Sequence, residues 1–158
     1  MEITYTVIPF ILVGLLFGYG LKVQATQTEL KNPDLVVDVT GYQWDWRFSY
    51  PAENISVVGA PATLPELVLP VDKRVRFNLV AADVAHSFFV PNFLTKRDLI
   101  PGVRNEIEVT PKRTGFFIGH CAEYCGQSHS DMNFRVKVVS QADYDTWIQQ
   151  QKGKAAAS

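Results

Sequence analysis

The chain has 158 residues, of which 47% are hydrophobic and 20% are charged, a balance typical of one globular unit with an apolar anchor. Its formal net charge is −1. Outside the N-terminal apolar stretch, 14 basic residues (15 minus Lys22) stand against 15 acidic ones (16 minus Glu2), and this near-neutral balance argues against nucleic acid as a partner.

The first predicted element is a membrane-spanning helix within residues 1–23. Ile3 to Leu21 carry no charge, and these 19 residues come close to the ~20 that a helix needs to cross a bilayer. Pro9 and Gly14 are tolerated in such a helix. A secretory signal would have a basic start and a shorter apolar core, so it is disfavoured, and a buried core helix is the remaining alternative.

Residues 24–33 form a predicted polar linker, and residues 34–140 form a predicted domain of short strands. Apolar and polar side chains alternate with a period of two in several segments, which is typical of half-buried strands. The strand candidates, bounded by turns rich in Pro and Gly, are 35–40, 42–50, 74–79, 87–90, 106–109, 115–120 and 134–138. Many short strands predict a mainly β fold, either a sandwich or a barrel.

The chain is predicted to end in a helix and a tail, residues 141–158. Ser140, followed three residues later by Asp143, is typical of a helix N-terminus, and the helix is expected over Tyr144–Gln151. Lys152–Ser158 are expected to fray.

The most informative motif is Cys-x3-Cys-x3-His-x2-Met, formed by Cys121, Cys125, His129 and Met132, with His86 upstream. Thiolates, imidazoles and a thioether suit copper or zinc, and the methionine favours copper. Because a mononuclear blue-copper site takes one cysteine, two cysteines on one tight loop indicate two copper ions bridged by both sulfurs. A disulfide is sterically feasible but leaves the histidines and the methionine unexplained. Taken singly, the methionine would be a core residue and His86 a structural histidine.

The same residues resemble the copper A (CuA) site of the cytochrome c oxidase subunit II family. The family pattern is His-Ser-aromatic followed by Gly-x-Cys-x-Glu-x-Cys-Gly-x-x-His-x-x-Met, which matches His86–Phe88 and Gly119–Met132. The resemblance implies a set of copper ligands: bridging Cys121 and Cys125, terminal His86 and His129, and weak axial Met132 and the backbone carbonyl of Glu123. It also implies a magnesium ion shared with subunit I, bound through the Glu123 side chain.

The resemblance covers most of the chain. Glu2–Pro9 resembles the start of the family's second transmembrane helix, Gly41–Trp46 its aromatic segment, and Lys96–Gly102 a further block. The sequence departs from the family in having one apolar helix where two are usual, in Asp45 within the usual Trp-Tyr-Trp, and in the spacing before Arg104. The implied fold is a cupredoxin-like Greek-key β-sandwich.

Three further residues are candidates for functional roles, two of them through the resemblance. Trp44 matches a tryptophan at the family's cytochrome c docking surface, where electrons enter. Its neighbour Trp46 is two residues on, so one continuous strand would put both on the same face, and core packing is the alternative role. Asp83 is a candidate for an acidic docking rim, against the simpler reading of a solvated loop residue. Glu2 matches the entrance of a proton path, against a charge that only ends the span.

The implied function is the electron-accepting subunit of a respiratory cytochrome c oxidase, taking electrons from cytochrome c and passing them to haem in subunit I. Such a subunit would lie in a bacterial cell membrane with its copper domain on the periplasmic or extracellular side. The alternatives are a copper-delivery or copper-sensing membrane protein and the CuA domain of a nitrous oxide reductase. That reductase family generally has tryptophan where this sequence has Glu123. Quinol oxidase subunit II lacks the cysteine pair.

Overall fold

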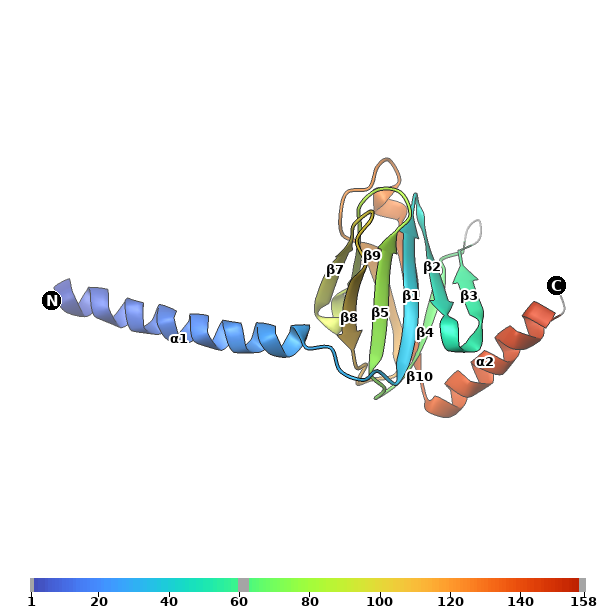
Figure 1. Ribbon diagram of the computed structural model, residues 1–158, viewed down its shortest axis with the longest axis horizontal. Helices are drawn as coiled ribbons and strands as arrows, with labels where there is room; N and C mark the ends of the chain where they lie inside the picture. Colours follow the sequence, from blue (N-terminus) through green and yellow to red (C-terminus); the bar gives the residue numbers. More distant parts are fainter. Residues whose placement is uncertain (1, 60–62, 157–158) are drawn as a thin grey trace. The chain divides into compact units, whose positions relative to one another are not determined.

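The computed structural model describes residues 2–59 and 63–156 and divides the chain into two units, Met1–Lys31 and Asn32–Ser158. The first unit consists mainly of α1 (Glu2–Thr28), which has no buried residue. By length and composition, α1 is able to cross a membrane, with a mean hydropathy of 1.9 in its most apolar window. The helix continues past residue 23, so the first five residues of the predicted linker are helical (Figure 1).

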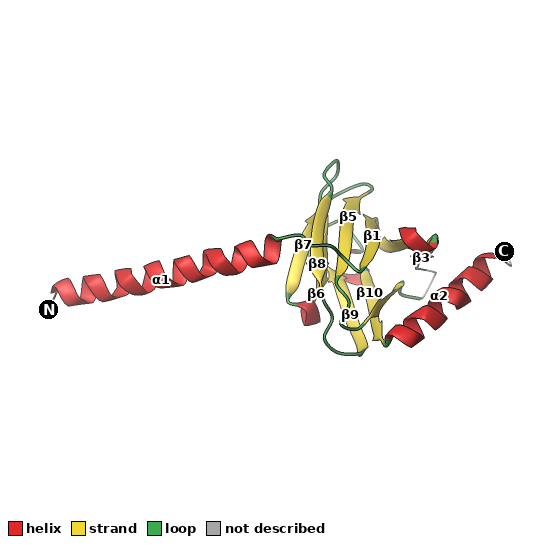
Figure 2. Cartoon of the chain, turned by 60° about the horizontal axis from the view of Figure 1, so that its bottom comes forward, coloured by secondary structure: helices red, strands yellow, loops and turns green. Residues whose placement is uncertain are grey.

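The second unit contains two five-stranded sheets packed face to face (Figures 1 and 2). In order across the first sheet, the strands are β3 (Ile55–Val58), β2 (Asp45–Tyr50), β1 (Leu35–Tyr42), β5 (Val75–Ala81) and β8 (Asn105–Val109). Across the second sheet they are β4 (Glu66–Pro70), β10 (Asn133–Val139), β9 (Gly115–Cys121), β6 (His86–Val90) and β7 (Thr95–Leu99). Three short 3-10 helices lie in the connections: η1 (Pro51–Glu53), η2 (Pro91–Phe93) and η3 (His129–Asp131).

Strand direction brings several connections to one end of the sandwich. β1 and β5 are parallel, so both end at the same edge of the first sheet. β9 is antiparallel to both β6 and β10, so the end of β9 meets the starts of its two neighbours. The short connection from β5 to β6 joins these two edges. Three loops, those that connect β1 to β2, β5 to β6 and β9 to β10, therefore gather at the same end.

The core between the sheets is aromatic. Phe88 and Phe134 stack with ring centroids 5.0 Å apart, and the edge of Trp46 meets both rings. All three side chains are fully buried. Gly119 on β9 leaves room for the Phe134 ring, because a Cβ at residue 119 would overlap it. The period-two alternation of β10 places Phe134, Val136 and Val138 inside, as its sequence predicts.

The predicted single strand 42–50 is wrong. Tyr42 and Asp45 are paired residues of an antiparallel hairpin, and Gln43 and Trp44 form the turn between β1 and β2. A turn interrupts the alternation of a strand, so the two tryptophans do not share a face. Trp46 is completely buried, whereas 39% of Trp44 is exposed.

The C-terminal helix α2 (Gln141–Ala156) begins as the sequence predicts. The backbone N–H of Asp143 donates to Ser140 Oγ at 3.2 Å, and the Ser140 hydroxyl donates to the Asp143 carboxylate at 2.7 Å. The helix runs beyond Gln151, so the expected fraying of 152–156 is wrong, and residues 157–158 lie outside the described residues. A contact distant in the sequence accompanies the extra turn, since the Lys152 ammonium pairs with the Glu53 carboxylate.

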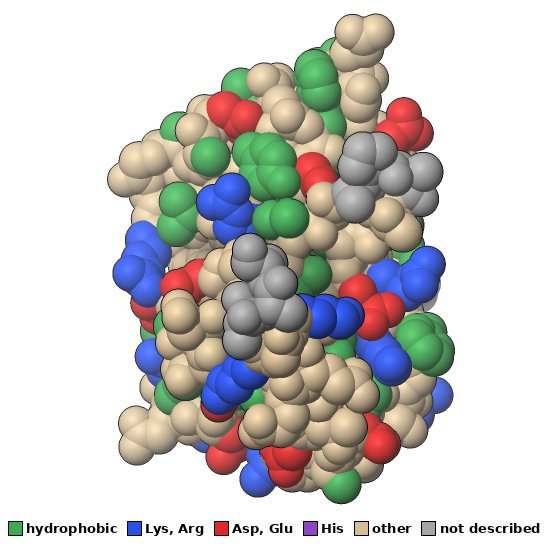
Figure 3. Space-filling model, turned by 90° about the vertical axis from the view of Figure 1, so that its right-hand side faces the viewer, with side chains coloured by type: hydrophobic (Ala, Val, Ile, Leu, Met, Phe, Trp, Pro, Cys, Tyr) green, Lys and Arg blue, Asp and Glu red, His purple; other side chains and the backbone are tan. Residues whose placement is uncertain are grey.

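Charges of both signs are mixed over the surface. On the face shown in Figure 3, basic and acidic side chains are interspersed rather than segregated. Ion pairs such as Lys112–Asp72, with nitrogen and oxygen 3.1 Å apart, neutralise them locally. Together with a net charge of −1, this mixture gives the molecule a weak long-range field.

The Tyr50 hydroxyl generates a stability prediction. It donates to the Val68 carbonyl and accepts from the Val68 N–H, each at 2.9 Å, inside the core. Tyr50→Phe leaves both backbone groups unpaired, so we expect a loss of about 2 to 4 kcal/mol in the free energy of unfolding, measured by denaturant titration.

Tyr144→Phe is the matched control. The Tyr144 hydroxyl is also buried but has no hydrogen-bond partner among the described residues. Its removal should leave the free energy of unfolding unchanged or raised. Equal losses from the two substitutions would contradict the role given to the Tyr50 hydroxyl.

Candidate metal centre

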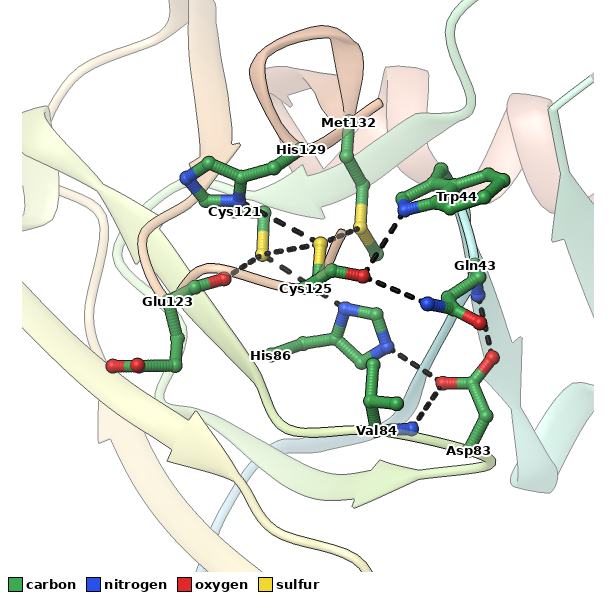
Figure 4. Close-up of polar contacts among 10 residues, drawn as sticks. All are labelled: Gln43, Trp44, Asp83, Val84, His86, Cys121, Glu123, Cys125, His129 and Met132. Carbon is green, nitrogen blue, oxygen red and sulfur yellow. Dashed lines mark hydrogen bonds and ion pairs between the residues drawn. The ribbon is translucent and has the colours of Figure 1, made fainter. Parts of the chain in front are cut away.

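The gathered loops carry the residues of the Cys-x3-Cys-x3-His-x2-Met motif. His86 is the first residue of β6, and Cys121 is the last residue of β9. Cys125 lies in the following loop, His129 opens η3, and Met132 directly precedes β10. Figure 4 shows their side chains converging from these elements on one point. The structure thus brings together residues that are up to 46 positions apart, His86 and Met132.

The two cysteine sulfurs lie at the middle of this group, 3.8 Å apart, and both cysteines are free. Each sulfur has its own histidine. His86 Nδ1 is 3.9 Å from Cys121 Sγ, and His129 Nδ1 is 3.6 Å from Cys125 Sγ. The arrangement is nearly symmetric, with one imidazole nitrogen on each side of a sulfur pair.

Two weaker donors complete the group. The backbone carbonyl of Glu123 is 3.3 Å from Cys121 Sγ, and Met132 Sδ is 3.7 Å from Cys125 Sγ. The carboxylate of Glu123 points away from the sulfurs (Figure 4). Hence the structure assembles all six donor groups of the sequence prediction, with Glu123 contributing its carbonyl rather than its side chain.

Four of the six donor residues are withdrawn from solvent. His86 is fully buried, and Met132, Cys125 and Cys121 expose 1%, 3% and 7% of their surfaces. Burial in a medium of low polarity is unfavourable for an isolated charge. A bound cation would supply the opposite charge that two buried thiolates need.

The pKa values of the two thiols are displaced in opposite directions. Burial by itself raises the pKa of Cys121, but contacts with His86 and with the Glu123 and Ser87 backbone outweigh it and lower this pKa to about 6. Burial, together with the neighbouring Cys121 thiolate, raises the pKa of Cys125 to about 12. Without metal and at neutral pH, the two thiols therefore carry one negative charge between them rather than two.

Asp83 orients the first histidine. Its carboxylate lies 2.8 Å from His86 Nε2 and accepts backbone N–H bonds from Val84 at 2.6 Å and Gln43 at 2.7 Å. Because a carboxylate only accepts, Nε2 carries a proton, which leaves Nδ1 as the nitrogen that would bind a metal. Sequence reasoning missed this contact, although a spacing of three residues in one loop was its available signal. The docking role of Asp83 stays a prediction.

A second contact missed by sequence reasoning holds the cysteine loop. The Cys125 carbonyl accepts from Gln43 Nε2 at 2.8 Å and from the indole Nε1 of Trp44 at 3.1 Å. Trp44 thus lies directly on the residue that carries one of the central sulfurs, while part of its ring faces solvent. The remaining predicted residue, Glu2, is in the first turn of α1.

The donor set fits copper. Soft sulfur donors combined with imidazole select copper, zinc or iron–sulfur clusters, and a buried thioether favours copper among these. His86, Cys121 and Cys125 each offer one ligand atom, and these three atoms lie within 4.8 Å of one another. This spacing allows the three side chains to hold a metal ion.

Comparisons with known proteins agree with this geometry. Residues 58–139 match the family "Cytochrome C oxidase subunit II, periplasmic domain". The chain is 40% identical to a probable cytochrome c oxidase subunit 2 of Streptomyces avermitilis, over 91% of this chain and 57% of that protein. It is 32% identical to cytochrome c oxidase subunit 2 of Mycobacterium bovis, over 95% and 58%. The chain thus spans less than three fifths of the length of these curated relatives.

A solved structure supports the fold. The periplasmic domain of cytochrome oxidase subunit II of Bradyrhizobium japonicum superposes with a TM-score of 0.73 and 34% identity, over 80% of this chain and 99% of that domain. The cupredoxin-like β-sandwich expected from the sequence is confirmed. The family match, which covers more than half of the chain, decides its membership. The chain belongs to the cytochrome c oxidase subunit II family.

Proposed function

We propose that this chain is the electron-accepting subunit of a haem–copper cytochrome c oxidase. The observation that carries the proposal is the pair of free, buried sulfurs 3.8 Å apart, each with its own histidine nitrogen. These six donor groups would hold a binuclear copper centre of the CuA type, with Cys121 and Cys125 as bridges. Bound there, two coppers sharing one electron supply a redox couple whose bonds change little on reduction.

The protein contributes rigidity and exclusion of water. The ligand loops leave the ends of strands whose side chains pack in an aromatic core, and Trp46 Nε1 donates to the Met132 carbonyl at 3.2 Å. A fixed ligand shell keeps the same geometry in both redox states, which favours fast electron transfer. Burial of the sulfurs also keeps competing ligands and oxidants away.

Trp44 is the proposed point at which electrons enter. It is the exposed aromatic residue whose N–H touches the Cys125 carbonyl, so an electron arriving at the indole is one hydrogen bond from a sulfur-bearing residue. The proposed donor is cytochrome c or a cytochrome c domain. The proposed acceptor is haem in subunit I, where oxygen is reduced.

The chain is proposed to divide as its sequence suggests: residues 1–23 as a membrane anchor, 24–33 as linker, 34–140 as the copper domain and 141–158 as a C-terminal helix and tail. We place the anchor in a bacterial cell membrane and the copper domain on the periplasmic or extracellular side. The outward carboxylate of Glu123 is the candidate magnesium ligand at the boundary with subunit I. Glu2 is the candidate for the proton-path entrance.

The alternatives are less well supported. A copper-delivery or copper-sensing protein must release or exchange its metal, whereas four of the six donor residues here are buried. The CuA domain of a nitrous oxide reductase shares the ligand chemistry, but the family model that matches this chain is that of cytochrome c oxidase subunit II.

Copper content is the first test. The copper-reconstituted chain should hold two coppers and show the mixed-valence thiolate absorption spectrum, because two bridging sulfurs are available. Cys121→Ser and Cys125→Ser should each abolish that spectrum. One tightly held copper per unmutated chain, or a preference for zinc, would contradict the binuclear assignment.

Met132 tests the role of the weak donor. Met132→Leu keeps the buried volume but removes the thioether, which as an axial donor stabilises the oxidised centre more than the reduced one. We therefore expect a coloured site that still holds two coppers and has a higher midpoint potential in a redox titration. An unchanged potential and spectrum would make Met132 a packing residue only.

Trp44 and salt dependence test the docking surface. Exposed charges are screened over about 8 Å at physiological ionic strength, and a mixed, near-neutral surface gains little from steering. Trp44→Ala should slow reduction by the native cytochrome at least tenfold, as expected of an aromatic hot spot, and leave the copper spectrum unchanged. The midpoint potential is measured alongside, because the indole also donates to the Cys125 carbonyl. Stopped-flow measurements across a salt series provide the rates.

Asp83→Asn should slow reduction by the cytochrome less than Trp44→Ala does. Because Asp83 also contacts His86, the copper spectrum of the Asp83→Asn variant is recorded alongside the rates. A steep salt dependence combined with a harmless Trp44→Ala would show that charge, rather than the aromatic contact, governs docking.

A further inference from the structure

Gln43 lies between two of the loops that carry candidate copper ligands. Its backbone N–H donates to Asp83 Oδ2 at 2.7 Å, and Asp83 in turn holds His86. Its side-chain Nε2 donates to the Cys125 carbonyl at 2.8 Å. We call these two hydrogen bonds of Gln43 the Gln43 bridge (Figure 4). The bridge connects the residue that orients one histidine to the residue that carries one of the sulfurs.

Gly126 provides the space that the bridge needs. Its φ of +118° is in the region that favours glycine, and a Cβ there would lie 3.1 Å from Gln43 Nε2 and 3.2 Å from the Trp44 ring. The residue after Cys125 must therefore be small for the amide to reach the Cys125 carbonyl. Both the glycine in the cysteine loop and the β1–β2 turn therefore allow Gln43 to approach the Cys125 carbonyl closely.

The Gln43 bridge restrains the positions of two candidate copper ligands, His86 and Cys125. The His86 and Cys125 loops leave different strands, and no covalent link shorter than 39 residues joins the two positions. The hydrogen bonds of Gln43 restrain the separation of these loops directly. Without the side-chain amide, the Cys125 carbonyl keeps its bond from Trp44, so no buried acceptor is left unpaired. The change would loosen one loop without unfolding the domain.

The bridge also acts on charge. The Gln43 and Trp44 N–H dipoles both point their positive ends at the peptide of Cys125. Positive partial charge near the centre stabilises the state with one more electron. Loss of one dipole should therefore make reduction less favourable.

We propose that Gln43 is a positioning residue of the metal centre, which holds the Cys125 loop and the Asp83–His86 pair at a fixed separation and thereby slows metal loss and raises the midpoint potential. This inference rests on the proposed binuclear copper function. Gln43 touches neither metal nor sulfur in this role and acts through Cys125 and Asp83.

The experiment compares Gln43→Leu with Asn105→Leu in the full-length chain, reconstituted with copper. Asn105 is the matched control because its Nδ2 also donates to a backbone carbonyl, that of Asp98, at 2.7 Å. Both substitutions lose one amide-to-carbonyl hydrogen bond at a partly buried place. Gln43→Glu is the second variant, since it keeps size and polarity but sets an acceptor against the Cys125 carbonyl.

Three measurements are made on each variant: the rate of copper release to an excess of chelator, the midpoint potential, and, in the copper-free protein, amide hydrogen exchange at Gln43. For Gln43→Leu we expect copper release about five- to tenfold faster, as for one lost hydrogen bond, a lower potential and faster exchange. Gln43→Glu should show effects at least as large. Asn105→Leu should match the unmutated chain in all three.

The proposal is overturned if both Gln43 variants release copper at the unmutated rate and keep its potential, or if Asn105→Leu shows the same changes. The failure of the proposed function is a separate result, because it appears in the unmutated chain as the absence of two coppers.

Discussion

Two buried sulfurs at 3.8 Å are the constraint on which the rest of this domain depends. Thiolates so close together repel each other, and burial adds to the free energy required to ionise both. The displaced pKa values of Cys121 and Cys125 express that conflict, since one thiol ionises easily and its neighbour resists. Without metal, other contacts must keep the two cysteines close together. Hydrogen bonds from the surrounding residues to the cysteine loop provide them.

The sandwich provides those supports through strand direction. A parallel β1–β5 pair and antiparallel β6–β9–β10 pairs bring the loops to one end, where their backbone and side-chain donors meet. The rigid aromatic core behind them limits how far any loop can move. The ligand group is therefore anchored at strand ends and bonded loop to loop. Neither device alone would fix six donors from two separate segments of the chain.

The two tryptophans show how one turn divides structural and functional roles. Trp46 fills the core and donates to the Met132 carbonyl, behind the ligand loop. Trp44, two residues earlier, lies in the hairpin turn and donates to the Cys125 carbonyl from the solvent side. Both thus hold the same loop from opposite sides, and only the exposed one is available to a partner. The indole of Trp44 is a support as well as a contact surface.

The donor set and the class of fold were predictable from the sequence alone. Ligand chemistry depends on residue type and local spacing, so Cys121, Cys125, His129 and Met132 were identifiable from one short run. Strands such as 134–138 were also predictable, because alternation is a local property. The length of α1 past residue 23 and of α2 past Gln151 was not, since local signals leave helix ends poorly defined.

The residues that support those donors became identifiable only in the folded structure. The bonds from Gln43 and Trp44 to Cys125 join the β1–β2 turn to the cysteine loop and span more than 80 positions. No local pattern encodes such contacts, because they arise from strand order and from the hairpin turn at Gln43–Trp44. That turn also reversed the expected placement of Trp44 and Trp46, since a period-two argument holds only while the strand continues.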